Sequence, residues 1–284
     1  MRYFLKQSYY KIFIIALAIG CVVPITWNCL SIVIYKYWFS HNLLVAPVTP
    51  EKKAILDGIV SQKFTYVTQG STHEVFLSED GKHILKLFLN KSREKNIPFL
   101  SKLGEIRKSH KRKKRNFEGC MNAYYLLKEE TGLIYYHFAP TDYFTTPLIL
   151  INKLGEKREI DLDATEFFLQ KKAVVTFEYL DRCLALNQID KANDALKKLL
   201  EFTIALYCQG IVMVDLQLMS NFGFIDDLPA RIDIEHIEFK KSWKTDHKEH
   251  LKSQVEYFRE WILQNHAPLL ESFDTVSKDL FLKT

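Results

Sequence analysis

The most distinctive part of the hydropathy pattern is an uninterrupted apolar segment near the N-terminus. Residues Ile12 to Tyr35 span 24 positions without a charged side chain. A helix of that length rises about 36 Å, enough to cross the roughly 30 Å hydrocarbon core of a bilayer. Lys11 and Lys36 bracket the segment, and aromatic residues lie near both ends, where they favour membrane interfaces. The pattern predicts one transmembrane helix over residues 12–35, behind a short flank of residues 1–11.

Two other interpretations of this segment stay open. A positively charged start followed by an apolar run is also typical of a secretory signal, and the residues before Cys21 weakly resemble a lipoprotein cleavage box. The apolar run continues well past Cys21, which favours a retained span. A buried core helix is the second alternative, which Pro24 in mid-segment and the lack of a polar face disfavour.

After a linker over residues 36–60, the pattern changes to short alternating segments. The region from Phe64 to Leu89 is rich in β-branched and aromatic residues, with turn signals at Gly70 and at Asp80-Gly81. This pattern predicts three antiparallel strands. Between Leu133 and Leu180 the chain is again strand-rich, with a hairpin predicted around Gly155.

Lys86 stands in the middle of the third predicted strand, where a compact charge is costly unless it has a partner. One interpretation is a lysine on an edge strand whose ammonium reaches water. The other is a phosphate-binding lysine that faces a cleft under the Gly70 turn. Taken alone, these residues favour the first.

A second patterned region lies downstream. Asp190 to Gln209 has apolar residues at helical spacing and ends at Gly210, a residue typical of a helix C-terminus. Three short apolar segments follow, and polar residues stand at their ends: Asp215 after the first, Asn221 before the second and Asp233 after the third. The pattern predicts a buried helix and three short strands.

This order of helix, strand, Asp, loop, Asn, strand, turn, strand and Asp resembles the nucleotide site of kinases. The chain resembles the protein-kinase-like superfamily over most of residues 64–238. The resemblance implies an α+β, bilobal fold. A strand-rich N-lobe with a strand-rich insertion would occupy residues 61–182, and a shortened helical C-lobe would occupy residues 183–284.

The resemblance also implies that the chain binds ATP and Mg²⁺. Six residues match positions of the kinase pattern: Gly70 in the phosphate loop, Lys86 as the third-strand lysine, Glu118 as its partner carboxylate on the next helix, Asp215 as the catalytic-loop Asp that accepts the hydroxyl proton, and Asn221 and Asp233 as metal ligands.

Several positions depart from the family pattern. Met213 and Val214 replace the usual His and Arg before the catalytic Asp, and Ser220 stands where the metal-binding Asn is expected, one position before Asn221. Glu235 replaces the glycine of the metal-binding turn. These departures support the alternative of a pseudokinase.

The C-terminal part is short. Only 284 − 233 = 51 residues follow Asp233, and no Ala-Pro-Glu signature is present. That length is too small for the substrate-binding helices of a full protein kinase and predicts about two closing helices.

Composition and cysteine usage indicate a folded core and a compartment for the chain. Hydrophobic residues make up 48% and charged residues 26%, so the chain can bury a core. The five cysteines form neither a disulfide framework nor a metal-ligand spacing, which is compatible with a reducing compartment. The net charge of +5 comes from the basic run at Arg107 to Arg115, whose seven Lys and Arg leave 5 − 7 = −2 for the rest.

The basic run suggests a partner. Nucleic acid is not expected, because no stacking aromatics are interleaved with the charges. Anionic lipid fits better, since a membrane-anchored domain would hold the run near a charged surface. Because ATP and reduced thiols are cytosolic, the prediction is a single-pass protein with its N-terminus outside and its domain in the cytoplasm.

Three functions remain open at this stage. The first is an ATP- and Mg²⁺-dependent phosphotransferase acting on a hydroxyl group, with a small-molecule or lipid-linked acceptor suited to the short C-lobe. The second is a pseudokinase that acts as a binding or scaffolding module. The third is an α+β interaction module whose likeness to kinases is accidental. The acceptor and any protein partner are not identified by the sequence.

Overall fold

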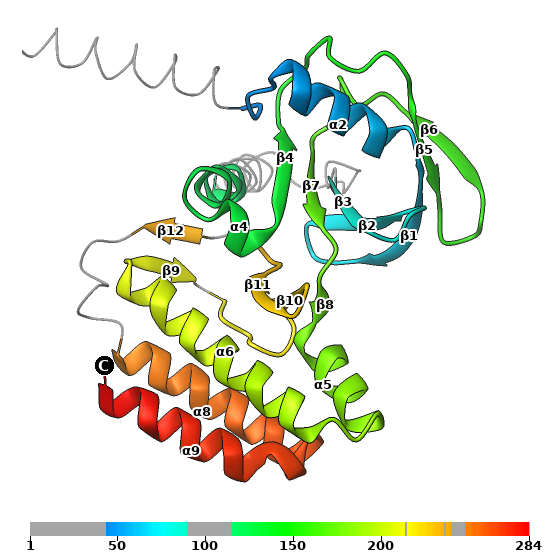
Figure 1. Ribbon diagram of the computed structural model, residues 1–284. Helices are drawn as coiled ribbons and strands as arrows, with labels where there is room; N and C mark the ends of the chain where they lie inside the picture. The colour runs from blue at the N-terminus through cyan, green and yellow to red at the C-terminus, as the bar shows by residue number, and fades with distance from the viewer. Residues whose placement is uncertain (1–43, 90–114, 214, 236, 240–247, 284) are drawn as a thin grey trace, which may run out of the picture. The chain divides into compact units, whose positions relative to one another are not determined.

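The computed structural model describes residues 44–89, 115–213, 215–235, 237–239 and 248–283. The chain divides into two compact units, residues 1–45 and 46–284, and all labelled elements belong to the second (Figure 1). Within the described ranges, no helix combines the length and the apolar character needed to cross a bilayer. The predicted span over residues 12–35, and the basic run up to residue 114, lie outside them.

The first part of this unit is built on a seven-stranded sheet with the order β4-β7-β3-β2-β1-β5-β6. Neighbouring strands are antiparallel except β1 and β5, which are parallel. The strands are β1 (Lys63–Gln69), β2 (His73–Ser78), β3 (His83–Phe88), β4 (Leu133–His137), β5 (Leu148–Ile151), β6 (Lys157–Ile160) and β7 (Phe167–Lys171). The accompanying helices are α2 (Pro50–Val60), a helix over residues 115–126, and α4 (Lys128–Thr131).

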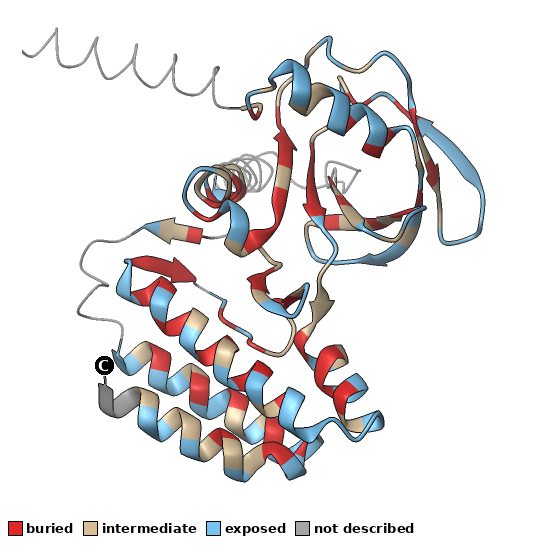
Figure 2. Ribbon diagram, viewed as in Figure 1, coloured by how far each residue is buried: buried red, intermediate tan, exposed pale blue. Residues whose placement is uncertain are grey.

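The three strands expected between Phe64 and Leu89 are confirmed as β1, β2 and β3. Gly81 in the second turn has a φ of 71°, a conformation that glycine adopts without strain. Phe64 and Leu85 are completely buried. Apolar side chains of β4 and β7 extend the same core, and Figure 2 shows both strands as largely buried.

The predicted hairpin around Gly155 is confirmed as β5 and β6, and Gly155 has a φ of 82°. Its place in the sheet could not be predicted. β5 pairs in parallel with β1, for example Phe64 with Leu150, so the hairpin extends the sheet at the β1 edge. The outermost strand, β6, is mostly exposed (Figure 2).

Residues 50–60, which the sequence analysis assigned to the linker, form α2. The hydroxyl of Thr49 caps this helix by accepting a hydrogen bond of 3.3 Å from the backbone N–H of Lys52, and Pro50 occupies its first turn. Leu56, Ile59 and Val60 are buried.

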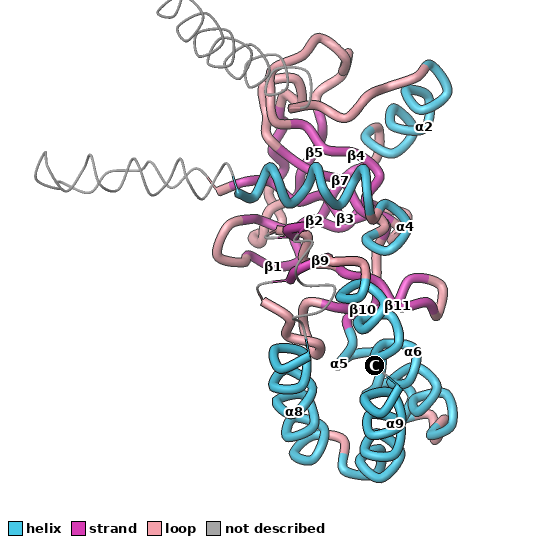
Figure 3. The backbone as a smooth tube through the Cα atoms, turned by 90° about the vertical axis from the view of Figure 1, so that its left-hand side faces the viewer, coloured by secondary structure: helices cyan, strands magenta, loops and turns pink. Residues whose placement is uncertain are grey.

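The second part of the unit is mainly helical (Figure 3). Its helices are α5 (Thr176–Ala185), α6 (Ile189–Cys208), α8 (Lys248–Asn265), the 3₁₀ helix η1 (Ala267–Leu269) and α9 (Leu270–Lys283). Short strands lie beside them: β8 (Val174–Val175), β9 (Ile211–Met213), β10 (Phe222–Ile225), β11 (Leu228–Arg231) and β12 (Ile237–Phe239). They form a three-stranded sheet, β11-β10-β8, and a two-stranded sheet, β12-β9.

The predicted buried helix is confirmed as α6, and Gly210, with a φ of 84°, ends it. The strand predicted at Phe222 is confirmed as β10. The strand predicted to begin at Arg231 lies earlier in the chain, because β11 ends at Arg231 and includes Leu228 and Pro229, which were expected in the turn. The two strands form an antiparallel hairpin whose turn residues, Asp226 and Asp227, have φ values of 52° and 62°. Positive φ at both positions gives the turn the twist that matches its strands. The two closing helices are confirmed as α8 and α9.

Gly223 lies in β10 at the point where this strand pairs with β8, the strand that connects the two parts of the unit. A Cβ atom there would press against the backbone carbonyl of Val174 and lie 3.2 Å from Cα of Val175. Since backbone atoms cannot rotate away, we expect Gly223→Ala to lower the free energy of unfolding by about 2 kcal/mol, measured by urea denaturation.

Gly58→Ala is the matched control for this variant. Gly58 is an exposed residue of α2, and a Cβ atom there would meet nothing within 4 Å. We expect that substitution to stabilise the protein by about 0.5 kcal/mol. Equal effects of the two variants would contradict the close approach of β8 and β10.

Candidate functional site

Lys86 projects from the middle of β3 toward the segment that follows β11. Its Nζ donates a hydrogen bond of 2.7 Å to the carbonyl oxygen of Ile232. Burial lowers the pKa of Lys86, and the carboxylates of Asp233 and Glu235 oppose that shift. β3 lies between β2 and β7, so the interpretation of Lys86 as an edge-strand lysine is wrong.

Asp215 and Asn221 stand at the two ends of the loop between β9 and β10. Nδ2 of Asn221 donates a hydrogen bond of 3.2 Å to the carbonyl oxygen of Asp215. The backbone N–H of Asn221 donates one of 2.8 Å to the carbonyl oxygen of Gln217. These bonds close the loop although it carries one residue more than the kinase pattern, and Asp215 stays exposed.

Backbone hydrogen bonds bring Asp233 to the same loop. The carbonyl oxygen of Asn221 accepts a bond of 3.0 Å from the N–H of Ile232 and one of 3.3 Å from the N–H of Asp233. Oδ1 of Asp233 lies 3.4 Å from the backbone N–H of Glu235, which donates to it. The two predicted metal ligands, Asn221 and Asp233, are therefore neighbours.

The donor atoms of this pair suit Mg²⁺, which prefers oxygen and keeps several waters or phosphate oxygens in its shell. Because Nδ2 of Asn221 faces the carbonyl of Asp215, Oδ1 is the atom left for a cation. Across the part of the chain that the structure describes, no three His, Cys, Asp or Glu side chains gather as a metal site. For a cation at this position, Asp233 thus offers a carboxylate and Asn221 a carboxamide oxygen, which are the two groups that the resemblance implies.

Gly70 begins the phosphate turn, residues 70–72, between β1 and β2. Its N–H donates a hydrogen bond of 2.9 Å to the carbonyl oxygen of His73, and the carbonyl of Thr72 accepts one of 2.8 Å from Leu89. A Cβ atom on Gly70 would make only ordinary contact, 3.9 Å from the oxygen of His73. The fold itself does not demand glycine here, whereas a closely approaching ligand would.

Glu118 is exposed on the helix over residues 115–126, and Asn116 and Cys120 are buried. Residues four apart share one helix face, whereas a residue two positions away is turned about 200° from it. The helix therefore turns Asn116 and Cys120 toward the protein interior. The pairing of Lys86 with Glu118 stays a prediction.

Arg231, at the end of β11, is a residue that the sequence analysis did not single out. It is only 1% exposed. Its Nε donates a hydrogen bond of 2.6 Å to the carbonyl oxygen of Asp233, and Nη2 donates one of 2.7 Å to the carbonyl oxygen of Asp215. Its guanidinium also lies 4.8 Å from the centre of the Phe222 ring. Arg231 thus links the loop between β9 and β10 to the segment that follows β11.

The same signal that marked Lys86 could have found Arg231. Both are charged residues in segments that the sequence predicts as strands. One further atom, Nη1 of Arg231, is buried without a hydrogen-bond partner among the described residues. A buried guanidinium with a spare donor beside Asp215 and Asp233 fits a site that receives an anion.

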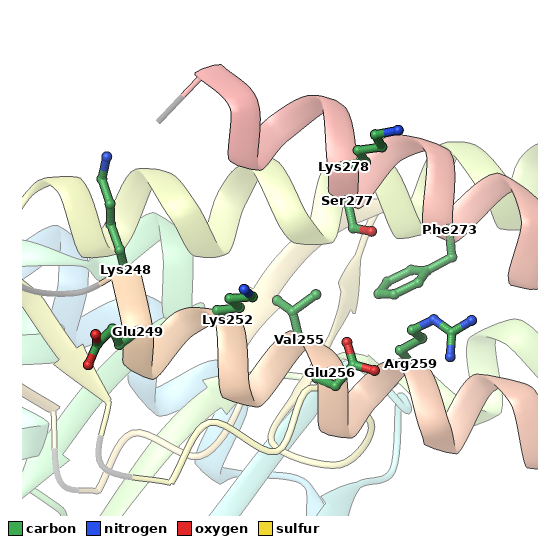
Figure 4. A pocket seen from close by; sticks show the side chains of 9 residues that line it. All are labelled: Lys248, Glu249, Lys252, Val255, Glu256, Arg259, Phe273, Ser277 and Lys278. Carbon is green, nitrogen blue, oxygen red and sulfur yellow. The ribbon is translucent and has the colours of Figure 1, made fainter.

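A separate cavity of about 470 Å³ lies between α8 and α9 (Figure 4). Charged side chains surround an apolar floor of Val255 and Phe273. Arg259 at its rim is held by Asp274, with Nε 2.7 Å from Oδ1 and Nη2 2.9 Å from Oδ2. The cavity contains none of the residues of the predicted nucleotide site.

Comparison with known proteins gives limited information. No protein-family profile matches the sequence, and no curated protein matches it significantly. Among solved structures, the bifunctional kinase-methyltransferase WbdD shares 17% identity at a TM-score of 0.36, over 73% of this chain and 43% of WbdD. Rv3197 from Mycobacterium tuberculosis, in complex with erythromycin, shares 15% identity at a TM-score of 0.34, over 81% of this chain and 60% of Rv3197.

The chain thus spans less than two thirds of the length of either protein.

Proposed function

We propose that this protein binds ATP together with Mg²⁺ and transfers a phosphoryl group in the manner of a kinase. The observation that carries the proposal is the bond from Nζ of Lys86 to the carbonyl of Ile232. It joins a lysine of the third strand to the residue next to Asp233, and Asn221 is bonded to the same segment. Residues separated by more than a hundred positions thus converge, and this supports the proposal.

Each residue has a role in this proposal. Lys86 binds the phosphates, and Asp233 and Oδ1 of Asn221 hold the metal. Bound Mg²⁺ would supply neutralisation of the phosphate charge. Asp215 orients the acceptor hydroxyl and receives its proton, for which its exposed position leaves access. The backbone of the phosphate turn binds the phosphates, and the lack of a side chain at Gly70 permits their close approach.

A pseudokinase is the second candidate, and one observation favours it. The hydroxyl of Thr72 in the phosphate turn donates a hydrogen bond of 2.9 Å to Oε2 of Glu235. The phosphate turn is therefore already bonded to an anion of the protein itself. Together with Ser220 in place of the usual Asn, this contact fits a protein that binds a nucleotide without turning it over.

Nucleotide binding tests the proposal directly. We expect the full chain, purified in detergent, to bind ATP about tenfold more tightly in Mg²⁺ than in EDTA, measured by isothermal titration calorimetry. Lys86→Met should weaken binding in Mg²⁺ by about 10- to 100-fold, because it removes a charge-assisted hydrogen bond to phosphate.

The outcomes separate the candidates. Absence of ATP binding by the unchanged chain would reject both the enzyme and the nucleotide-binding pseudokinase. Binding that depends on Lys86, without loss of the γ-phosphate to water or to any hydroxyl acceptor supplied, would support the pseudokinase.

The predicted membrane span and lipid contact add a location to the proposal. A span over residues 12–35 would place the site near the cytoplasmic face of a membrane, where a lipid-linked hydroxyl acceptor would be within reach. Contact of Arg107 to Arg115 with anionic lipid would strengthen that placement.

A further inference from the structure

The cavity between α8 and α9 lies where both helices carry small side chains. On α8, Val255 is the smallest of the four buried residues. On α9, Phe273 is 1% exposed, and Ser277 follows it one turn later on the same helix face. The hydroxyl of Ser277 donates a hydrogen bond of 3.1 Å to the carbonyl oxygen of Asp274, so it is satisfied within its own helix. Val255 and Ser277 thus leave a gap that larger side chains would fill.

One end of this gap is fixed by an ion pair between the two helices. Arg259 of α8 donates to both carboxylate oxygens of Asp274 of α9, at 2.7 Å and 2.9 Å. A bidentate pair of this kind fixes the orientation of the groups that it joins. Figure 4 shows Val255 and Phe273 pointing toward each other across the gap. With a volume of about 470 Å³, the cavity is within the size range of small-molecule sites.

Two lysines of α8 flank the apolar floor of the cavity. A helix turns about 100° per residue, so Lys248 and Lys252 lie about 20° and 60° from the direction of Val255. The acidic residues of the lining, Glu249 and Glu256, lie about 120° and 100° from it, nearer the outer rim. Within the described ranges, neither lysine side chain has an ion pair or a hydrogen bond. The floor is therefore flanked by two ammonium groups that an anion could bind.

The floor and the two lysines together fit one class of ligand. The side chains of Val255 and Phe273 favour an apolar body, and the face of the Phe273 ring favours an aromatic one. The ammonium groups favour an anionic end and disfavour a cation. An inorganic anion would leave the apolar floor uncovered. An uncharged apolar molecule would cover the lysines without giving them a partner.

We propose that the cavity between α8 and α9 is a binding site for a small aromatic carboxylate. Its ring lies on Val255 and Phe273, in the space that the small side chain of Ser277 leaves, and its carboxylate is bound by Lys248 and Lys252. None of the residues of the proposed nucleotide site line this cavity. The inference therefore goes beyond the proposed function and does not depend on it.

Binding of naphthoate tests this site. We expect the full chain, in a neutral detergent, to bind naphthoate with a Kd of about 1 mM or tighter, because a ligand with so few atoms has limited affinity. Calorimetric titration measures this binding, with titration into detergent alone as the blank. Naphthamide, an uncharged analogue of the same shape, should bind about fivefold or more weakly, because it lacks the charge-assisted bonds to the lysines.

Two substitutions locate the binding site. Lys252→Met keeps most of the apolar side chain and removes the ammonium group, so it should weaken naphthoate binding about fivefold and leave naphthamide binding nearly unchanged. Ser277→Leu fills the gap and should abolish binding of both compounds. It should not lower the melting temperature, because a side chain that fills a cavity commonly stabilises a protein.

Each substitution has a matched control at an exposed position outside the cavity. Lys197→Met makes the same change on α6. Ser253→Leu makes the same change on α8, where the hydroxyl of Ser253 donates a comparable bond of 2.8 Å to the carbonyl oxygen of His250. Neither control should alter the affinity for naphthoate.

Three results would overturn the inference. The first is the absence of saturable naphthoate binding by the unchanged chain, and the second is equal affinity for naphthoate and naphthamide. The third is naphthoate binding that Lys252→Met and Ser277→Leu change no more than their controls do, which would place the ligand elsewhere on the protein. These titrations contain no nucleotide, so failure of ATP binding would leave their outcome unaffected.

Discussion

Replacing Asp233 with Asn is expected to weaken ATP binding in Mg²⁺ about tenfold, to the level that the unchanged protein shows in EDTA. Loss of an outer partner of a metal ligand commonly costs 10- to 100-fold in metal affinity, so loss of the charged ligand itself should remove the whole tenfold gain that Mg²⁺ gives to ATP binding. The variant keeps the shape of the side chain and the backbone bond from Asp233 to Asn221. The effect should therefore appear in the dependence on Mg²⁺.

Calorimetric titration of ATP with Asp233→Asn, in Mg²⁺ and in EDTA, measures this effect. Asp226→Asn is the matched control, since it removes the same charge from the exposed turn between β10 and β11, where Asn tolerates the φ of 52°. Retention of normal Mg²⁺ dependence by Asp233→Asn would contradict the metal role of Asp233.

Replacing Arg231 with Met is expected to lower the free energy of unfolding by about 3 kcal/mol. Two carbonyl oxygens, those of Asp215 and Asp233, would lose a charged donor, each worth about 1.5–3 kcal/mol before relaxation. Met restores part of the packing against Phe222, which limits the loss. Burial lowers the pKa of Arg231, and the carboxylates of Asp233 and Asp215 oppose that shift, so the guanidinium is matched to its surroundings.

Thermal and urea denaturation measure the loss, and two variants sharpen the test. Arg231→Lys should not restore stability, because one ammonium cannot reach both carbonyls as the planar guanidinium does. Arg182→Met, which removes an exposed arginine paired with Glu178, should cost about 0.5 kcal/mol or less. A loss at Arg231 no larger than that at Arg182 would show that Arg231 does not organise the loop.

Arg231 also holds the loop between β9 and β10, where Met213 and Val214 stand in place of the His and Arg of the kinase pattern. Met213 is 1% exposed and belongs to β9, where it pairs with Ile237 of β12. An apolar residue suits this buried strand position. The hydrogen bonds to the carbonyl oxygens of Asp215 and Asp233 come from Arg231 on β11, so the loop between β9 and β10 is held by β11.

The sequence predicted the local elements well, because their signals are local. The three strands around Gly70 and Gly81, the hairpin at Gly155 and the helix ending at Gly210 all follow from side-chain period and turn chemistry. The alternation of side chains along the third predicted strand also drew attention to Lys86, because a charged residue stands out in an otherwise apolar strand. It could not tell an edge strand from a central one, because strand order depends on pairings between distant residues.

The candidate site, like the fold, could be predicted from the sequence only in part. Asp215, Asn221 and Asp233 could be placed at strand ends from the order of residues along the chain, and the structure brings them together. The hydrogen-bond partner of Lys86 could not be chosen, because it is a backbone carbonyl, that of Ile232, which is 146 positions away in the sequence. The rotation of the helix over residues 115–126, which leaves Glu118 exposed, could not be predicted either.

The sequence by itself determined an α+β chain with a helix, strand and acid order that resembles kinases, and it predicted residues for a nucleotide site. The tertiary structure decided which groups meet the buried cations: the carbonyl of Ile232 meets Lys86, and the carbonyls of Asp215 and Asp233 meet Arg231. The physical reason is that burying a charge is favourable only against a specific partner. That partner is fixed by strand order and helix rotation, which no local pattern encodes.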